Sequence, residues 1–146
     1  MIARLLAIWM GAAMTTAAAA DGLGSVRWEY RPLLLFTPSA DHPALGAQST
    51  ILAADAAGLE DRRMAVYVVE RSRVLATFGA PAPEADAKAL RRRFGVPDDA
   101  FRVILVGLDG GAKLVSDTPL PTERLFATID GMPMRRRELR ERDEAD

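Results

Sequence analysis

Three unbroken apolar runs dominate the pattern of hydrophobic and polar positions along the chain. They occupy residues 33–36, 64–69 and 103–106. A strand buried on both faces shows this pattern, because its side chains point alternately toward two covered sides. The pattern therefore predicts three central strands of one sheet. Looser alternation allows an edge strand or lead-in at residues 25–30 and a further short strand at residues 74–78.

Apolar residues at helical spacing lie between these runs. The first helix is expected from the shared face of Leu45, Leu52, Ala56 and Leu59, and Gly58 is expected to mark its end. A second helix is expected over residues 84–94, where the apolar positions again follow helical spacing and a glycine comes next.

The last part of the chain predicts a hairpin followed by a helix. Asp109-Gly110 is the residue pair that a tight two-residue turn prefers, because both central positions of that turn favour positive φ. The return strand is expected at residues 112–115. Thr122 is expected to cap the helix that follows, and Gly131 to end it.

The predicted order of elements is β-α-β-α-β-β-α. The first β-α-β unit needs a crossover connection, so its two strands should be parallel. The second half is an antiparallel hairpin with a helix. This combination predicts an α/β fold consisting of a single thioredoxin-like domain, with a central mixed sheet and flanking helices. We expect the domain at residues 21–138 and a charged C-terminal tail at residues 139–146.

Residues 1–20 have the three parts of a secretory signal peptide. Arg4 supplies the positive charge, residues 5–13 are apolar, and Ala18 and Ala20 occupy the positions that the peptidase requires. The alternative is a membrane anchor, but the apolar run is shorter than the ~20 residues that span a bilayer. We therefore expect export to the periplasm or the medium, without a stable membrane anchor after cleavage.

Composition excludes several classes of chemistry. The chain has no cysteine, which rules out thiol catalysis, disulfide exchange and cysteine-ligated metals. His42 is the single histidine, so no site with several histidine ligands is possible. The net charge of −1 argues against broad electrostatic binding of nucleic acid. We expect no cofactor and no metal.

The loop of residues 37–45 lies where a thioredoxin-like fold places its active site. A helix N-terminus there would offer free N–H groups to an anion. The candidate anion-binding residues are Thr37, Ser39, His42 and Arg102. The alternative is ordinary capping of the helix by Ser39 or Asp41, with Arg102 paired to an acid at the edge of its strand. The carboxylate of Asp41 counts against strong anion binding.

A second candidate site is the basic segment near the C-terminus. Methionine and arginine are enriched at protein interfaces, and a set of both predicts a partner-binding edge at Met132, Met134, Arg135, Arg136 and Arg137. One alternative is a solvated tail whose charge is balanced by the acids that follow. Another is that the arginines pair with acids of the domain and dock the C-terminus.

The sequence of residues 107–138, GLDGGAKLVSDTPLPTERLFATIDGMPMRRRE, resembles the C-terminal signature of the domain of unknown function 4174. The similarity covers about residues 31–138, and the ID-x-MPMR-x-x-E ending is its most specific part. The resemblance implies a thioredoxin-like fold close to peroxiredoxins, in a family of short secreted bacterial proteins with a related domain in animal sushi-repeat extracellular proteins. It implies no particular activity. Leu108 departs from the lysine usual in the family.

Comparison with peroxiredoxins follows from this resemblance. Residues 33–36 with Thr37 and Pro38 match the peroxiredoxin strand and the proline that follows it. Arg102 matches the arginine that peroxiredoxins have at the start of a later strand. His42 stands where they have Thr or Ser, and Leu45 where they have the cysteine that attacks peroxide. Because a thiolate is the attacking species, peroxidase activity of that kind is excluded.

These observations favour an exported, cysteine-free thioredoxin-like protein that acts as a non-enzymatic binding or accessory module in the cell envelope. Its partner would be another envelope protein or a small anion, and not nucleic acid. The alternatives are a non-thiol enzyme or anion-binding protein that uses the 37–45 loop with Arg102, and an indirect role in oxidative-stress defence.

Overall fold

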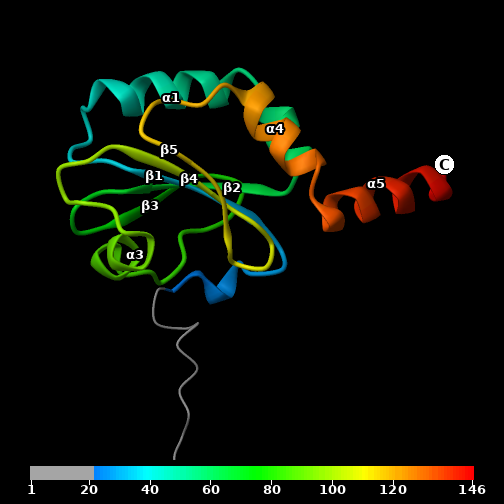
Figure 1. Cartoon of the computed structure of the whole chain (residues 1–146), viewed down its shortest axis with the longest axis horizontal. Helices are drawn as coiled ribbons and strands as arrows, with labels where there is room; N and C mark the ends of the chain where they lie inside the picture. Colours follow the sequence, from blue (N-terminus) through cyan, green and yellow to red (C-terminus); the bar gives the residue numbers. More distant parts are fainter. Residues whose placement is uncertain (1–21) are drawn as a thin grey trace, which may run out of the picture.

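The computed structural model describes residues 22–146, so the predicted signal peptide at residues 1–20 lies outside the described part of the chain. A five-stranded mixed sheet forms its centre, in the spatial order β3-β2-β1-β4-β5 (Figure 1). The strands are β1 (Arg31–Phe36), β2 (Met64–Val69), β3 (Val74–Phe78), β4 (Arg102–Val106) and β5 (Ala112–Ser116). β1 and β2 are parallel, and the other neighbouring pairs are antiparallel.

The strand order β2-β1-β4-β5, with β4 antiparallel to its neighbours, is that of a thioredoxin-like core. The predicted fold class, an α/β single domain with a mixed sheet and flanking helices, is therefore confirmed. β3 is an additional edge strand, antiparallel to β2. It lies at residues 74–78, where the alternating sequence pattern allowed a further short strand. Residues 25–30 contain no strand, because residue 25 ends a short 3-10 helix and residues 26–29 form turns.

Helices cover both faces of the sheet (Figure 1). On one face lie α1 (Pro43–Ala53), α2 (Ala56–Asp61) and α4 (Thr122–Asp130), and on the other lie α3 (Ala87–Phe94) and the short 3-10 helix η2 (Leu23–Ser25). α5 (Pro133–Ala145) follows α4 and projects beyond the sheet. β1 contributes side chains to the hydrophobic cores on both faces of the sheet, because Leu33 and Leu35 face α1 while Leu34 and Phe36 face α3.

The first predicted helix is two helices, and Gly58 does not end it. α1 stops at Ala53, and Gly58 lies inside α2. A Cβ atom on Gly58 would lie 2.6 Å from Cε2 of Phe126, which belongs to α4. The glycine therefore permits close packing of α2 against α4. This contact joins residues far apart in the sequence, so local spacing could not reveal it.

The hairpin between β4 and β5 is confirmed, but its turn is longer than predicted. Gly107 N donates to Gly111 O at 2.9 Å, and Gly110 N donates to Gly107 O at 3.0 Å. Gly110 has φ of 85°, whereas Asp109 has no positive φ. A turn followed by one glycine in the left-handed conformation is the usual form of a three-residue hairpin loop. Thr122 is the first residue of α4 and not its cap, which is Pro121.

Candidate functional site

The loop after β1 keeps its polar groups in local hydrogen bonds. Thr37 is buried, and its Oγ1 donates to Ser39 O at 2.6 Å. His42 is the N-cap of α1, where its Nδ1 accepts from Ala44 N at 3.2 Å. The capping alternative therefore describes this loop, although His42 makes the cap in place of Ser39 or Asp41. Pro43 at the first helical position suits this start.

His42 and Arg102, expected to share an anion, point to opposite faces of the sheet. The His42 ring stacks on Phe101 with centroids 5.5 Å apart, and Phe101 belongs to the core under α1. Arg102 is the next residue, so its side chain leaves on the other face. It pairs in register with Phe36 and donates to Asp117 Oδ1 at 2.8 Å. The structure thus brings Thr37 and Ser39 together, but does not bring Arg102 to His42.

A buried arginine that sequence reasoning missed lies behind this loop. Arg91 of α3 is 4% exposed and donates to the carbonyl oxygens of Thr37, Val69 and Pro97, at 2.9, 3.3 and 2.8 Å. Burial lowers the pKa of its guanidinium. Arginine in the last turn of a helix commonly binds carbonyl groups. Arg91 therefore ties α3 to the carboxyl ends of β1 and β2.

The segment with two methionines and three arginines forms the junction of α4 and α5. Met132 is the N-cap of α5 and Pro133 its first residue. Arg135 and Arg136 consequently lie in the first turn, which contains no acidic residue. The N-terminus of a helix carries a partial positive charge and favours acids. The helix thus begins with an unusual concentration of positive charge.

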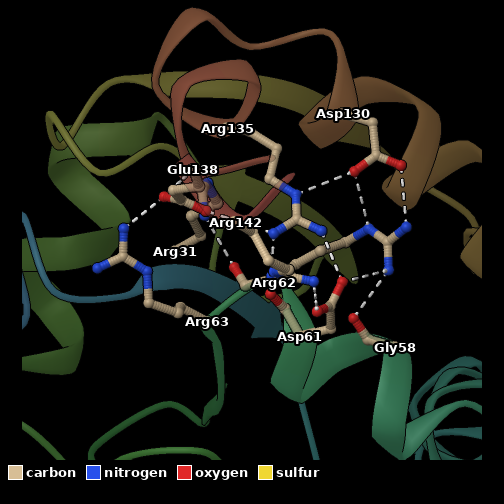
Figure 2. Close-up of polar contacts among 9 residues, drawn as sticks. All are labelled: Arg31, Gly58, Asp61, Arg62, Arg63, Asp130, Arg135, Glu138 and Arg142. Carbon is tan, nitrogen blue, oxygen red and sulfur yellow. Dashed lines mark hydrogen bonds and ion pairs between the residues drawn. The ribbon is translucent and has the colours of Figure 1, made fainter. Parts of the chain in front are cut away.

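Arg135 is buried and docks α5 onto the domain. Its guanidinium donates to Asp61 Oδ2 at 2.6 Å and to Asp130 Oδ1 at 3.2 Å (Figure 2). Burial opposes the charge of Arg135, but these hydrogen bonds outweigh it and raise the pKa of the guanidinium. The docking alternative therefore describes Arg135, which is not available on the surface as a partner-binding residue.

Glu138 binds two further arginines, which lie at the start of β1 and directly before β2. Arg31, at the start of β1, is fully buried and donates through Nη2 to Glu138 Oε1 at 3.0 Å. Arg63 also donates to Glu138 (Figure 2). Burial would raise the pKa of Glu138, but the hydrogen bonds from Arg31 and Arg63 prevail and lower it. One α5 carboxylate therefore neutralises the buried charge of β1.

Two more arginines complete the group. Arg62 holds Asp130 with two hydrogen bonds, of 3.1 and 2.9 Å, and lies 4.0 Å from the centre of the Phe126 ring. Arg142 donates to Asp61 at 2.8 Å. We call the set the ionic cluster, and its members are Arg31, Asp61, Arg62, Arg63, Asp130, Arg135, Glu138 and Arg142. Its five arginines exceed its three acids.

Three members of the ionic cluster lie on one face of α5. Arg135, Glu138 and Arg142 follow helical spacing and all reach back to the domain. The residues predicted as a charged tail, 139–146, continue α5 to Ala145. The sequence signal that could have indicated docking is Arg31, a charged residue at the start of the strand that contains the apolar run 33–36.

A groove lies between the β4–β5 turn and the start of α5, with a volume of about 510 Å³. We call it the α5 groove, and its main lining residues are Arg31, Leu108, Lys113, Met132, Pro133 and Met134. Arg136 and Arg137 are exposed on the helix that borders it. The structure thus divides the predicted partner-binding segment, with Arg135 docked inside and the two methionines at the groove.

Comparison with protein families finds a match to the family described as Domain of unknown function (DUF4174), over residues 22–138. The chain belongs to this family. The signature residues Asp130, Arg135 and Glu138 of this DUF4174 domain all belong to the ionic cluster, so the most specific part of the resemblance encodes the docking of α5. Comparisons with curated proteins and with solved structures find no match.

Two further findings on the DUF4174 domain concern metal binding and membrane-spanning helices. Among residues 22–146, no group of three or more His, Asp or Glu side chains is placed to hold a metal ion. Within the same residues, no helix combines the length and apolar character needed to cross a membrane.

Proposed function

We propose that the protein is a non-enzymatic binding or accessory module of the cell envelope, with the α5 groove as its binding surface. One observation carries this proposal. The ionic cluster fixes the start of α5 so that Met134, Arg136 and Arg137 are exposed beside an apolar groove. A solvated tail would need no such anchoring, whereas a binding surface needs a rigid support.

Export belongs to the same proposal. The pattern of residues 1–20 supports a signal peptide and a periplasmic or secreted location, with no stable membrane anchor after cleavage. The expected partner is another envelope protein or a small anion. The net charge of −1 does not favour nucleic acid.

The non-thiol enzyme that would use the 37–45 loop draws less support from the geometry. Thr37 and His42 hydrogen-bond within the loop, and Arg102 pairs with Asp117 on the other face. An indirect role in oxidative-stress defence has only the fold in its favour.

Affinity capture with matched variants tests the proposal. The tagged protein is mixed with envelope extract and lightly crosslinked, and retained proteins and small molecules are identified by mass spectrometry. The groove variant replaces Met134, Arg136 and Arg137 by Ala. The control replaces Lys88 and Arg92 by Ala, which are exposed on α3 and remove the same amount of positive charge.

We expect a component that the native protein and the control both retain and that the groove variant loses. Equal retention by both variants would place binding elsewhere. Retention of nothing above background would contradict a binding module. Circular dichroism of each variant verifies that α5 and the sheet persist.

A further inference from the structure

We propose that the α5 groove binds a small carboxylic acid with an apolar body, whose carboxylate lies at the N-terminus of α5 near Arg31. The apolar body would lie against Leu108, Met132 and Met134. This inference rests on the proposed binding function and specifies the chemistry of the ligand.

The first observation is the open N-terminus of α5. This helix has 13 residues, and Met132 at its N-cap offers no side-chain acceptor to it. The first intrahelical bond runs from Arg136 N to Met132 O at 3.0 Å. The N–H groups of Met134 and Arg135 precede that bond and have no acceptor within the helix. Such N–H groups are suited to a carboxylate.

The second observation is independent and concerns Arg31. This residue lines the α5 groove and is fully buried. Its two terminal nitrogens bind Arg62 O and Glu138, but its Nε–H has no hydrogen-bond partner among the described residues. A buried donor without an acceptor is costly, so an acceptor that reaches it from the groove is stabilised.

The charge around the α5 groove favours a single negative group. The ionic cluster contains five arginines and three acids, which leaves positive charge in excess. Asp109 is the one acid that lines the groove, and it is bound by Lys113 Nζ at 3.0 Å and by Gly111 N at 2.9 Å. Its charge is thus already paired, and a monoanion meets little repulsion.

The apolar lining gives the ligand its second property. Leu108 is buried, while Met132 and Met134 border the groove. Methionine is flexible and polarisable, so its side chain adapts to ligands of different shape. The volume of about 510 Å³ lies within the range of small-molecule sites. A free inorganic anion would leave this apolar surface in water.

Titration with octanoate, followed by the methyl resonances of methionine in NMR spectra, tests the inference. The signals of the three methionines that follow the predicted signal peptide, Met64, Met132 and Met134, are assigned by single Met→Leu substitutions. Met132 and Met134 report on the α5 groove. Met64, the buried first residue of β2, is the register neighbour of Arg31 and does not line the groove, so it serves as a reference for indirect effects. We expect saturable shifts of the two groove signals at neutral pH, larger than any shift of Met64.

Two ligands separate charge from apolar area. Octanol keeps the apolar chain without the carboxylate, and acetate keeps the carboxylate without the chain. We expect both to bind at least about tenfold more weakly than octanoate, because charge-assisted hydrogen bonds and buried methylene groups each contribute more than that factor. If octanol bound as tightly as octanoate, the carboxylate would not contribute to binding. If acetate bound as tightly as octanoate, the apolar chain would not contribute.

A matched pair of variants locates the carboxylate. Met134→Glu places a negative charge at the N-terminus of α5, where it favours the helix but repels an anion. Met134→Gln has nearly the same shape and no charge. We expect octanoate affinity to fall about tenfold or more in the Glu variant and by no more than about threefold in the Gln variant. Equal losses in the two variants would contradict a carboxylate at this helix end.

Failure of the ligand and failure of the proposed function give different results. If octanoate causes no saturable shift while affinity capture still depends on the α5 groove, the binding function stands and the ligand class is wrong. If both experiments fail, the α5 groove is not a binding site.

Discussion

Glu138 of α5 is the counter-ion of Arg31, a fully buried arginine at the start of β1 that lies 107 residues earlier in the chain. The pair joins the first central strand to the last helix. Because a buried charge without its partner is strongly destabilising, the fold of the sheet and the position of α5 depend on each other. The α5 groove therefore exists only when the C-terminal helix is docked.

Replacement of Glu138 by Gln should lower the free energy of unfolding by about 2–4 kcal/mol, because Arg31 keeps its charge and loses its counter-ion. Urea denaturation measures the change. Glu141→Gln is the matched control, since Glu141 lies on the same helix and is exposed. A Glu138→Gln protein with the same urea midpoint as the control would show that Arg31 does not need this pair.

Stability should fall in acid because the carboxylates of the ionic cluster have lowered pKa values. Hydrogen bonds from Arg135 lower the pKa of Asp61 below 3.8 against the opposing effect of burial. Burial would also raise the pKa of Glu138, but the hydrogen bonds from Arg31 and Arg63 lower it below 4.5. The unfolded chain then binds protons at higher pH than the folded chain. The stabilisation is complete above about pH 5 and is lost as pH falls through the folded pKa values.

Urea midpoints measured from pH 7 down to pH 3 test this dependence. The Glu138→Gln protein should show a shallower decline than the native protein, because one of the titrating groups is gone. Identical pH profiles for the two proteins would mean that Glu138 has the same pKa in the folded and unfolded chains.

The strands were predictable because burial on both faces leaves a local trace in the sequence. Residues 64–69 are apolar without interruption, and all of β2 is buried. The charged contacts left no such trace. Arg135 binds Asp61, which lies 74 residues away, and nothing near either residue indicates the partner. Sequence reasoning could identify the basic segment but could not separate the docked Arg135 from the exposed Arg136.

The 37–45 loop shows a second limit of sequence reasoning. His42 and Arg102 both lie near the end of β1, as the element order suggested. The face of the sheet to which each side chain points depends on the alternation of Phe101 and Arg102 at the start of β4. A shift of one residue in the strand register would reverse these faces. The sequence could therefore predict that His42 and Arg102 lie near the same strand end, but not whether their side chains point to the same site.

Replacement of His42 by Ala should cost about 1 kcal/mol of stability, because Ala44 N loses its capping acceptor and Phe101 loses its stacked ring. Asn is a good N-cap residue, so His42→Asn should recover part of the loss. Thermal unfolding of the two variants provides the comparison. If Asn is no better than Ala, the cap contributes little and the ring contact accounts for the effect.

Glycine-to-alanine substitutions in α1 and α2 should have opposite effects on stability. Gly46 of α1 has open space where a Cβ atom would be, so Gly46→Ala should stabilise the protein by about 0.5–1 kcal/mol through helix propensity. At Gly58 the new methyl group would lie 2.6 Å from the Phe126 ring, so Gly58→Ala should destabilise it by about 1–3 kcal/mol.

The contact between Gly58 and Phe126 can be isolated by a double-mutant cycle measured by urea denaturation. In a Phe126→Leu background the ring atoms that meet the added methyl group are absent, so the penalty of Gly58→Ala should shrink or change sign. A penalty that is unchanged in this background would have to arise within α2 itself. Since Arg62 also packs on the Phe126 ring at 4.0 Å, Phe126→Leu alone should weaken the ionic cluster slightly, and the cycle subtracts that effect.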